Sequence, residues 1–465
     1  MSADSVTAHR SDLPVANQRT VWALAWPIIL SNITVPLLGL TDTAILGHLD
    51  DVTPLAAVAI GAQLFTLLLW SFGFLRMGTT ALTSQELGRA GNNATLRILQ
   101  QSVWLVLPVT LLSVTLALTL TPLLLPLYGS DVAVQQMAAD YLHIRFWGIP
   151  LTLLQYCLIG WFIGRGETRI PMLMLITANV FNAGLDYLFV WHFHMAAEGV
   201  ALGTLLADSA ALALGLWAAF RRGLTLTLPR PDRAVMKVML GINSDLFIRT
   251  LCLLSVFACF TALGAHMSTE LLAANAVFIS LLLLISNALD GFAHAAESLT
   301  GRYIGAGIHQ ALRRILLLTG VNSLGVALLL ALSLITAGDL IFRLLTDNPD
   351  VLPLLQEMQV WLWLLPLTGV ASYWLDGVMI GAHASRAMRN SMLIAAFFVF
   401  APLAALPFAT ETFAPESFAI AIPLEPHHSL WLSFHLFLLA RALLLLPTFM
   451  HLWRSPGRFL RGELQ

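Results

Sequence analysis

Long apolar runs separated by short polar segments fill the chain from about residue 21 to residue 453. About 20 consecutive apolar residues are enough to cross the hydrocarbon core of a bilayer as an α-helix. A helix also satisfies its backbone hydrogen bonds internally, which lipid requires. The pattern therefore predicts an all-α polytopic membrane protein with twelve transmembrane helices. The predicted spans are residues 21–46, 54–78, 97–125, 138–163, 170–193, 197–220, 238–264, 270–297, 311–336, 352–381, 388–408 and 430–453.

Charge is distributed unequally between the two alternating sets of loops. Most arginines, and the single lysine Lys237, lie in or beside the set of loops that shares a side with both termini. The opposite set contains only Arg343 among the basic residues and carries acids such as Asp51. By the positive-inside rule, the tails at residues 1–20 and 454–465 are expected in the cytoplasm.

The two halves of the chain resemble each other at a nearly constant offset. Residues 146–152 (FWGIPLT) match residues 362–368 (LWLLPLT), and their prolines are shifted by 366 − 150 = 216. Gly88 and Gly305 match at a shift of 305 − 88 = 217. An internal repeat indicates duplication, and an even number of spans in each copy gives both copies the same orientation. The sequence therefore predicts two pseudo-symmetric six-helix lobes with a central cavity.

The longest predicted cytoplasmic connection lies between the two halves. It covers residues 221–237 and contains Pro229 and Pro231, which is typical of a linker. We therefore expect an N-lobe at residues 21–220 and a C-lobe at residues 238–453.

Composition narrows the function classes further. The chain has 465 residues, of which 58% are hydrophobic and 11% are charged, and its mean hydropathy is +0.80. A soluble domain carries about 25% charged residues, so a soluble enzyme is excluded. The net charge of −2 suggests no nucleic-acid partner. The three cysteines offer neither a disulfide framework nor a metal-binding spacing, and no nucleophile–base constellation or nucleotide-binding motif is present. We expect no enzyme activity and no cofactor, with an ion gradient as the energy source.

Polar residues inside the apolar spans are the first candidates for function, because an intramembrane charge costs about 2.5–3.5 kcal/mol. The first span carries Asp42 and Asn32 together with Pro27 and Pro36. Proline interrupts the helical hydrogen-bond ladder and permits a bend. A carboxylate beyond such a bend can couple its charge to helix bending, whereas a position near the outer mouth would leave Asp42 simply solvated.

Two further spans of the first half place polar side chains on single helix faces. Asn179, Asn182 and Asp186 are spaced i, i+3 and i+7, and Thr204 and Asp208 are spaced i and i+4. Together with the first-span aspartate they form an oxygen-rich set, which suits a proton carrier or a hard cation such as Na⁺. The alternative is a set of interhelical hydrogen bonds that only holds helices together.

The second half carries its own polar residues. Asp245 and Arg249 are spaced i and i+4 with the acid first, which favours a self-neutralised structural pair. The next span carries a polar stripe at i, i+3, i+7 and i+10, in which a histidine beside carboxylates is a plausible proton relay, although the last acid could reach cytoplasmic water. The stripe consists of Asn287, Asp290, His294 and Glu297.

Tyr373 and Asp376 lie near the middle of the span at residues 352–381. An acid beside aromatic rings fits a site for an organic cation. The histidine pairs His192–His194 and His427–His428 lie in predicted outer loops without a supporting carboxylate or cysteine. They are interpreted as solvated loop residues, and no metal site is expected.

Several segments together resemble the multidrug and toxic compound extrusion (MATE) family, and in particular its DNA-damage-inducible F (DinF) branch. The resemblance covers about residues 20–455. The residues that carry it are Trp26–Asn32, Val35–His48, Phe74–Met77, Asn182 with Asp186, Gly203–Thr204 and Leu289–Glu297.

The resemblance implies an antiporter of the bacterial inner membrane, which exports organic cations or amphiphilic drugs in exchange for H⁺ or Na⁺ by alternating access. Asp42 matches the family's first-helix aspartate, whose protonation is thought to bend that helix. Asn182, Asp186 and Thr204 match positions that join it in the N-lobe cation site. Some branches have a glutamate in the seventh span, where this chain has Asp245 and Arg249 instead.

Three alternatives stay open at this point. A major-facilitator-type metabolite carrier has a similar two-lobed repeat, but its loop signature between the second and third spans is not matched by residues 86–91 (ELGRAG). A lipid-linked oligosaccharide flippase would need several cavity arginines, and only Arg249, Arg145 and Arg441 lie within spans. A non-transport scaffold would show no gradient-dependent flux. Beyond substrate and membrane lipid we expect no partner, and we expect a monomer.

Overall fold

The computed structural model describes residues 14–48, 51–128, 131–225, 227, 229–346, 348–406 and 425–462, with the side chains of residues 35–38, 40, 461 and 462 left out. The described residues form helices and connecting turns and no strand. By internal contacts the chain divides into two units, and the boundary falls inside one long helix, between Phe247 and Ile248. The segment Pro14–Trp22 belongs to the second unit, whereas the chain from Ala23 belongs to the first.

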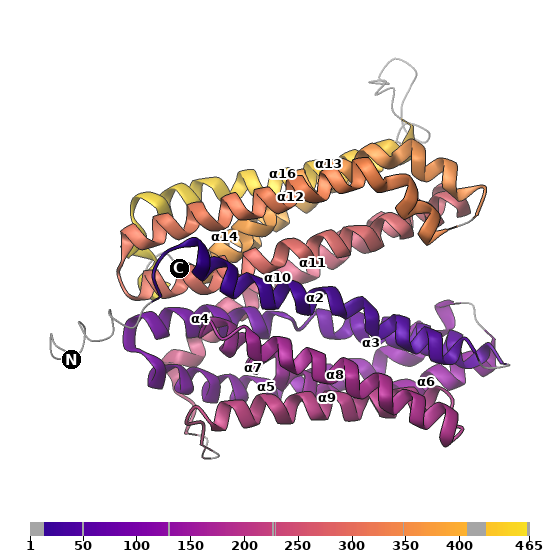
Figure 1. The fold of residues 1–465 in the computed structure, drawn as a ribbon, viewed down its shortest axis with the longest axis horizontal. Coiled ribbons are helices and arrows are strands. Elements are labelled where there is room, and N and C mark those ends of the chain that lie inside the picture. The colour runs from indigo at the N-terminus through magenta and orange to yellow at the C-terminus, as the bar shows by residue number, and fades with distance from the viewer. Residues whose placement is uncertain are drawn as a thin grey trace. The chain divides into compact units, whose positions relative to one another are not determined.

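The first unit contains most of the helices before the boundary (Figure 1). They are α2 (Gln18–Leu46), α3 (Thr53–Trp70), α4 (Phe74–Ala90), α5 (Asn92–Leu124), η1 (Leu125–Tyr128), α6 (Val132–Phe146), α7 (Ile149–Gly164), α8 (Arg169–Tyr187), η2 (Leu188–His192), α9 (Ala197–Phe220) and the beginning of α10 (Arg233–Met267). Within this unit α8 packs along α9, α4 along α7, and α6 along both α3 and α9.

The second unit continues from α10. It contains α11 (Thr269–Gly305), α12 (His309–Leu345), α13 (Val351–Gly381), α14 (Ser385–Ile394), η3 (Ala395–Phe400), α16 (Pro426–Arg454) and η4 (Pro456–Gly462). Here α13 is central, because it packs against α11, α12 and α16. Phe278, Phe342 and Trp431 are fully buried between these helices, and their rings stack or meet edge to face.

The apolar pattern predicted the positions of the helices well. Every predicted span overlaps a helix, and ten helical segments are long and apolar enough to cross a membrane among the residues described. The count becomes eleven if the bent pair α6 and α7 is one span. The chain is therefore an all-helical polytopic membrane protein, and the number twelve stays a prediction.

Two predicted spans are broken in the structure. The span at 54–78 is divided by a turn at residues 71–73 between α3 and α4, and α4 continues to Ala90. The span at 138–163 consists of α6 and α7, which meet at an angle of 50° around Gly148. Pro150 at the start of α7 has no N–H to donate back toward α6, so the ladder ends there.

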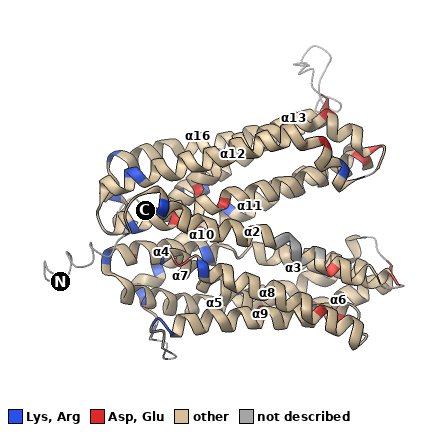
Figure 2. Cartoon of the chain, in the orientation of Figure 1, with Lys and Arg blue, Asp and Glu red and all other residues tan. Residues whose placement is uncertain are grey.

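Charges are unevenly placed within each unit. Lys and Arg are concentrated toward one end of the helices in Figure 2. This agrees with the loop asymmetry in the sequence. The cytoplasmic location of the two tails stays a prediction, as do the lobe boundaries at residues 21–220 and 238–453.

Candidate functional site

The first unit brings together the four residues predicted to form an ion-coupling site. Asp186 and Asn182 on α8 are fully buried, and Thr204 on α9 is nearly so. Asn182 Nδ2 donates a hydrogen bond of 3.1 Å to Thr204 Oγ1. Asp42, on α2 and partly exposed, lies beside Asp186. Side chains from three helices therefore converge on one carboxylate pair.

The carboxylate of Asp186 lacks well-placed hydrogen-bond donors in the described part of the chain. Among the described residues, neither of its oxygens accepts a hydrogen bond of good geometry from an N–H or O–H group. Asp42 Oδ1 is in the same situation. A buried carboxylate without donors carries a large desolvation cost when ionised, and two adjacent ionised carboxylates also repel each other. Such a pair favours a shared proton or a bound cation.

A glycine on α9 makes room for this pair. A Cβ atom at Gly203 would overlap Asp186 Oδ1, so only glycine lets α9 approach the carboxylate at this point. Close approach through small residues is a common feature of packed membrane helices. At Gly184, on the same helix as Asp186, an added Cβ would meet nothing within 4 Å.

Asp208, four residues after Thr204 on α9, has a different role from the one predicted for it. Its Oδ2 pairs with Arg145 Nη1 at 3.0 Å, and Gln155 Nε2 donates to its backbone oxygen at 2.7 Å. Arg145 is buried on α6, with its guanidinium carbon 4.3 Å from the ring centre of Phe65. Its positive charge also acts on the nearby carboxylates of the cluster. Sequence reasoning did not identify Arg145 as this partner, because the two residues are 63 positions apart.

The remaining first-half candidates lie along α2 and α8. Asn179 Nδ2 donates to the backbone oxygen of Thr34 at 3.1 Å, which links α8 to α2. Asn32 lies on α2 and is partly exposed. The chain passes through Pro27 as one helix, and the Ser31 hydroxyl donates to its carbonyl oxygen at 2.9 Å. The side chain of Pro36, the second predicted bending residue, lies outside the described residues.

The second unit contains a buried ion-pair centre on Asp376. Arg441 Nη2 donates to Asp376 Oδ2 at 2.6 Å, and Arg249 contacts the same oxygen. All three side chains are buried. Arg249 thus pairs with an acid 127 residues away, and its pairing with Asp245 stays a prediction. One expectation is corrected: the Asp376 carboxylate is engaged by two guanidinium groups rather than available to an organic cation. Asp245, expected as the partner of Arg249, is also buried.

The polar stripe on α11 packs against α13. His294 Nδ1 lies 3.0 Å from Glu297 Oε2. Glu297 is fully buried, which contradicts the alternative that this acid reaches cytoplasmic water. Asp290 and Asn287 lie one and two turns before His294, respectively, and are partly exposed. Tyr373 on α13 lies beside Ser286 of α11.

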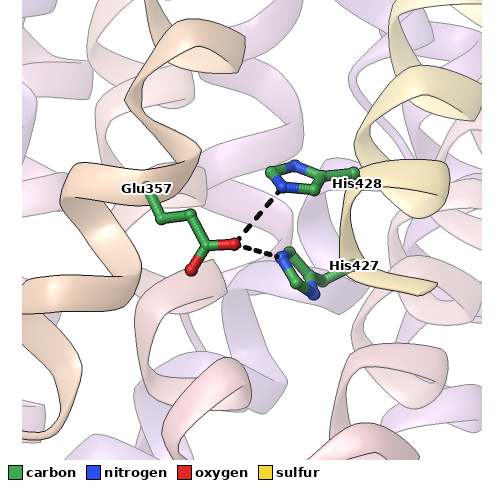
Figure 3. Close-up of side chains that lie close together, drawn as sticks. All are labelled: Glu357, His427 and His428. Atoms are coloured by element: carbon green, nitrogen blue, oxygen red, sulfur yellow. Dashed lines mark ion pairs between the residues drawn. The ribbon is translucent and has the colours of Figure 1, made fainter. Parts of the chain in front are cut away.

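A carboxylate lies beside one of the two histidine pairs, a contact that the sequence did not indicate. Glu357 of α13 faces His427 and His428, which occupy the first turn of α16 (Figure 3). The interpretation of these two as solvated loop residues without a carboxylate neighbour was therefore wrong. The other pair fits its interpretation better, since His192 and His194 are both exposed.

Comparison with known proteins identifies the family. The MatE family model matches residues 27–188 and 246–406. DNA damage-inducible protein F of Escherichia coli (strain K12) is 35% identical over 95% of this chain and 94% of its own length. "Probable multidrug resistance protein NorM" of Xanthomonas axonopodis pv. citri is 28% identical over 76% of this chain and 78% of its own length.

Solved structures give the same fold. The crystal structure of the Vibrio cholerae MATE transporter VcmN in the bent form superimposes with a TM-score of 0.81 at 17% identity, covering 98% of this chain and all of that one. An outward-facing multidrug resistance MATE family transporter gives a TM-score of 0.79 at 17% identity, covering 97% of this chain and 98% of that one. The match to the family model and to the E. coli relative argues against a soluble enzyme and against a major-facilitator carrier. The chain belongs to the MatE family of multidrug efflux transporters and is a transporter rather than an enzyme.

Proposed function

We propose that this protein is a secondary antiporter of the bacterial inner membrane, which exports organic cations or amphiphilic compounds in exchange for H⁺. The coupling site consists of Asp42, Asp186, Asn182 and Thr204. The observation that carries the proposal is the proximity of the carboxylates of Asp42 and Asp186. Within the described part of the chain, Asp42 Oδ1 and both Asp186 oxygens lack well-formed hydrogen bonds. A membrane carboxylate pair of this kind must hold a proton or a cation to stay neutral enough for burial.

The position of Asp42 suggests how ion binding affects the helices. Its helix α2 contains Pro27. The carbonyl oxygen of Thr34, also on α2, accepts a hydrogen bond from Asn179 on α8. Protonation of the pair removes the repulsion between Asp42 on α2 and Asp186 on α8, whereas deprotonation restores it. The two charge states therefore favour different positions of α2 against α8, which is the differential interaction that alternating access requires.

Na⁺ is the alternative coupling ion, because the same oxygen atoms are suitable ligands for a hard cation. Proton coupling is favoured by the small number of ligands. Two carboxylates, one amide and one hydroxyl come from the chain, and one lone pair of Thr204 Oγ1 already accepts the hydrogen bond from Asn182 Nδ2 at 3.1 Å.

The flippase alternative receives less support. A lipid diphosphate would require arginines that are available for phosphate oxygens. Arg249 and Arg441 are engaged with Asp376, and Arg145 is engaged with Asp208. The amphiphilic-cation class therefore fits better than a polyanionic lipid.

The test is efflux from proteoliposomes that contain the purified protein. Ethidium is loaded inside, and a pH gradient or a Na⁺ gradient is imposed separately. Efflux driven by the pH gradient and lost in Asp42→Asn supports the proposal. The control is Asp51→Asn, an exposed acid before α3, which should transport like wild type. Efflux driven only by the Na⁺ gradient would show that the coupling ion is Na⁺ rather than H⁺. Equal efflux by Asp42→Asn and wild type would refute the assignment of Asp42 to the coupling site.

A further inference from the structure

A group of three possible metal ligands lies away from the ion-coupling site, within the second unit. His427 Nε2 lies 3.4 Å and His428 Nε2 lies 3.5 Å from the same oxygen, Oε1 of Glu357 (Figure 3). One ligand atom from each residue falls within 4.8 Å of the other two. Among the described residues, no other set of three His, Cys, Asp or Glu side chains meets this condition.

These distances are close to those between the ligands of a tetrahedral metal ion. Zinc binds histidine nitrogen at about 2.0–2.1 Å and carboxylate oxygen at about 2.0–2.2 Å, so two ligands at a tetrahedral angle are about 3.3–3.5 Å apart. The two N–O separations at Glu357 already have this value. A metal ion could therefore enter without a large movement of the α13 or α16 backbone.

His427 is oriented for metal binding through Nε2. Its side chain is 6% exposed, and its Nδ1 lies 3.5 Å from Oε2 of Glu425. A carboxylate at Nδ1 favours the tautomer with the proton on that nitrogen, which leaves the Nε2 lone pair for a metal. Nε2 is buried and has no hydrogen-bond partner of good geometry in the described part of the chain. A cation between this nitrogen and the Glu357 carboxylate would satisfy both groups.

His428 has a different second contact. Trp361 Nε1 donates a hydrogen bond of 2.9 Å to His428 Nδ1. A neutral histidine that binds a metal through Nε2 carries its proton on Nδ1, and Nδ1 can then no longer accept from the indole. Metal binding at His428 must therefore break the Trp361 hydrogen bond. Metal binding should therefore change the tryptophan fluorescence of the protein.

We propose that Glu357, His427 and His428 bind a divalent transition metal ion of the Zn²⁺ class, with a water molecule in the fourth position. Imidazole and carboxylate ligands suit this class, and three protein ligands plus one open position form a known type of zinc site. The ion would join α13 to the first turn of α16. Because Glu357 is about half exposed, the ion would be accessible from solvent. It would lie at the end of the helices that the charge pattern predicts to face away from the cytoplasm.

The experiment uses the full-length purified protein in detergent, with any affinity tag removed and with Cys259→Ser to eliminate the exposed thiol. Zn²⁺ is titrated against a chromophoric chelator, and Co²⁺ is added separately because its visible absorption reports tetrahedral coordination. Tryptophan fluorescence is followed in both titrations. The test variants are Glu357→Gln and His428→Ala, and the control is the double variant His192→Ala/His194→Ala, which removes the exposed histidine pair.

The proposal predicts one Zn²⁺ per chain, a tetrahedral Co²⁺ spectrum and a fluorescence change that saturates with the same ion. Affinity should fall at least about tenfold in both test variants and stay unchanged in the control. Trp361→Phe should bind metal as tightly as wild type or more tightly, because a competing hydrogen bond is gone.

Thermal unfolding without metal separates misfolding from ligand loss. If Glu357→Gln unfolds like wild type and still binds one Zn²⁺ with undiminished affinity, the site is wrong. Absence of stoichiometric binding to the wild-type protein would also overturn it, and the contacts would then be only a hydrogen-bond chain from Trp361 through His428 to Glu357. A loss in Trp361→Phe as large as in Glu357→Gln would contradict the tautomer argument.

Discussion

Arg441 donates a 2.6 Å hydrogen bond to Oδ2 of Asp376, in the buried interior of the second unit. The same oxygen also faces Arg249. Sequence spacing suggested none of this, because the residues come from α10, α13 and α16. The position of Asp376 in a span made it a candidate for substrate charge recognition, whereas its contacts make it the anionic centre that holds two guanidinium groups.

Removal of this acid should be more damaging than removal of an exposed acid. Asp376→Asn leaves two buried guanidinium groups without their carboxylate, and breaking a buried pair in this way costs about 3–5 kcal/mol. We expect a clear fall in the thermal unfolding temperature of the detergent-solubilised protein. Asp339→Asn, an exposed acid on α12, is the control and should unfold like wild type. Equal unfolding temperatures for the two variants would contradict a structural role for Asp376.

A second prediction concerns the hydrogen bond between Asn182 and Thr204. Thr204→Val keeps the side-chain shape but removes the acceptor, and an interhelical hydrogen bond in a membrane contributes about 0.6–2 kcal/mol. Thr204→Ser retains the hydroxyl and should behave like wild type in stability and transport. We expect Thr204→Val to reduce gradient-driven ethidium efflux more than it reduces the unfolding temperature. Identical efflux by the two variants would show that the hydroxyl plays no part in coupling.

A third prediction concerns the space at Gly203. In Gly203→Ala the added methyl group overlaps the Asp186 carboxylate, so either α9 or the carboxylate must move. Overpacking of this kind typically costs about 1–3 kcal/mol. We expect transport to be strongly reduced, because the displaced carboxylate is separated from Asp42.

The matched control for this change is Gly184→Ala on α8. Its added methyl group meets nothing within 4 Å, and alanine is favoured over glycine in a helix by about 0.5–1 kcal/mol. Transport by Gly184→Ala should equal wild type and its stability should be equal or higher. Equal transport by both alanine variants would contradict the need for glycine at position 203.

A fourth prediction concerns the pair Arg145 and Asp208. Asp208→Asn leaves the buried guanidinium of Arg145 near the carboxylates of Asp42 and Asp186, which become its remaining anionic neighbours. A nearby positive charge favours the ionised form of a carboxylate. The pH dependence of efflux should therefore move toward lower pH, since a higher proton concentration is needed to protonate the pair. An unchanged pH profile in initial-rate efflux measurements would contradict this electrostatic link.

The helix positions and the first-unit cluster were predictable for clear physical reasons. Apolar run length reports where the chain can lie in lipid, and spacing of i, i+3 and i+7 places Asn182 and Asp186 on one helix face. Hydropathy does not report helix continuity, however. Pro150 follows Gly148 at a 50° break, whereas Pro366, at the matching position of the repeat, lies inside the continuous helix α13.

Contacts between distant segments were not predictable from a single sequence. Arg145 meets Asp208 across 63 residues, and Glu357 meets His428 from another helix. Neither spacing nor composition contains this information, because it depends on how the helices pack. The same limitation explains why Asp376 was interpreted without its arginine partners.

The central claim is that the Asp42–Asp186 pair holds the coupling ion and releases it in exchange for substrate. The most direct test adds ethidium to the purified protein in weakly buffered detergent solution and records H⁺ with a pH dye and Na⁺ with a selective electrode. We expect substrate-triggered release of about one H⁺ per chain by the wild type and by Asp51→Asn, and none by Asp42→Asn or Asp186→Asn when these variants are equally well folded. Proton release of undiminished size by Asp42→Asn and Asp186→Asn would contradict it.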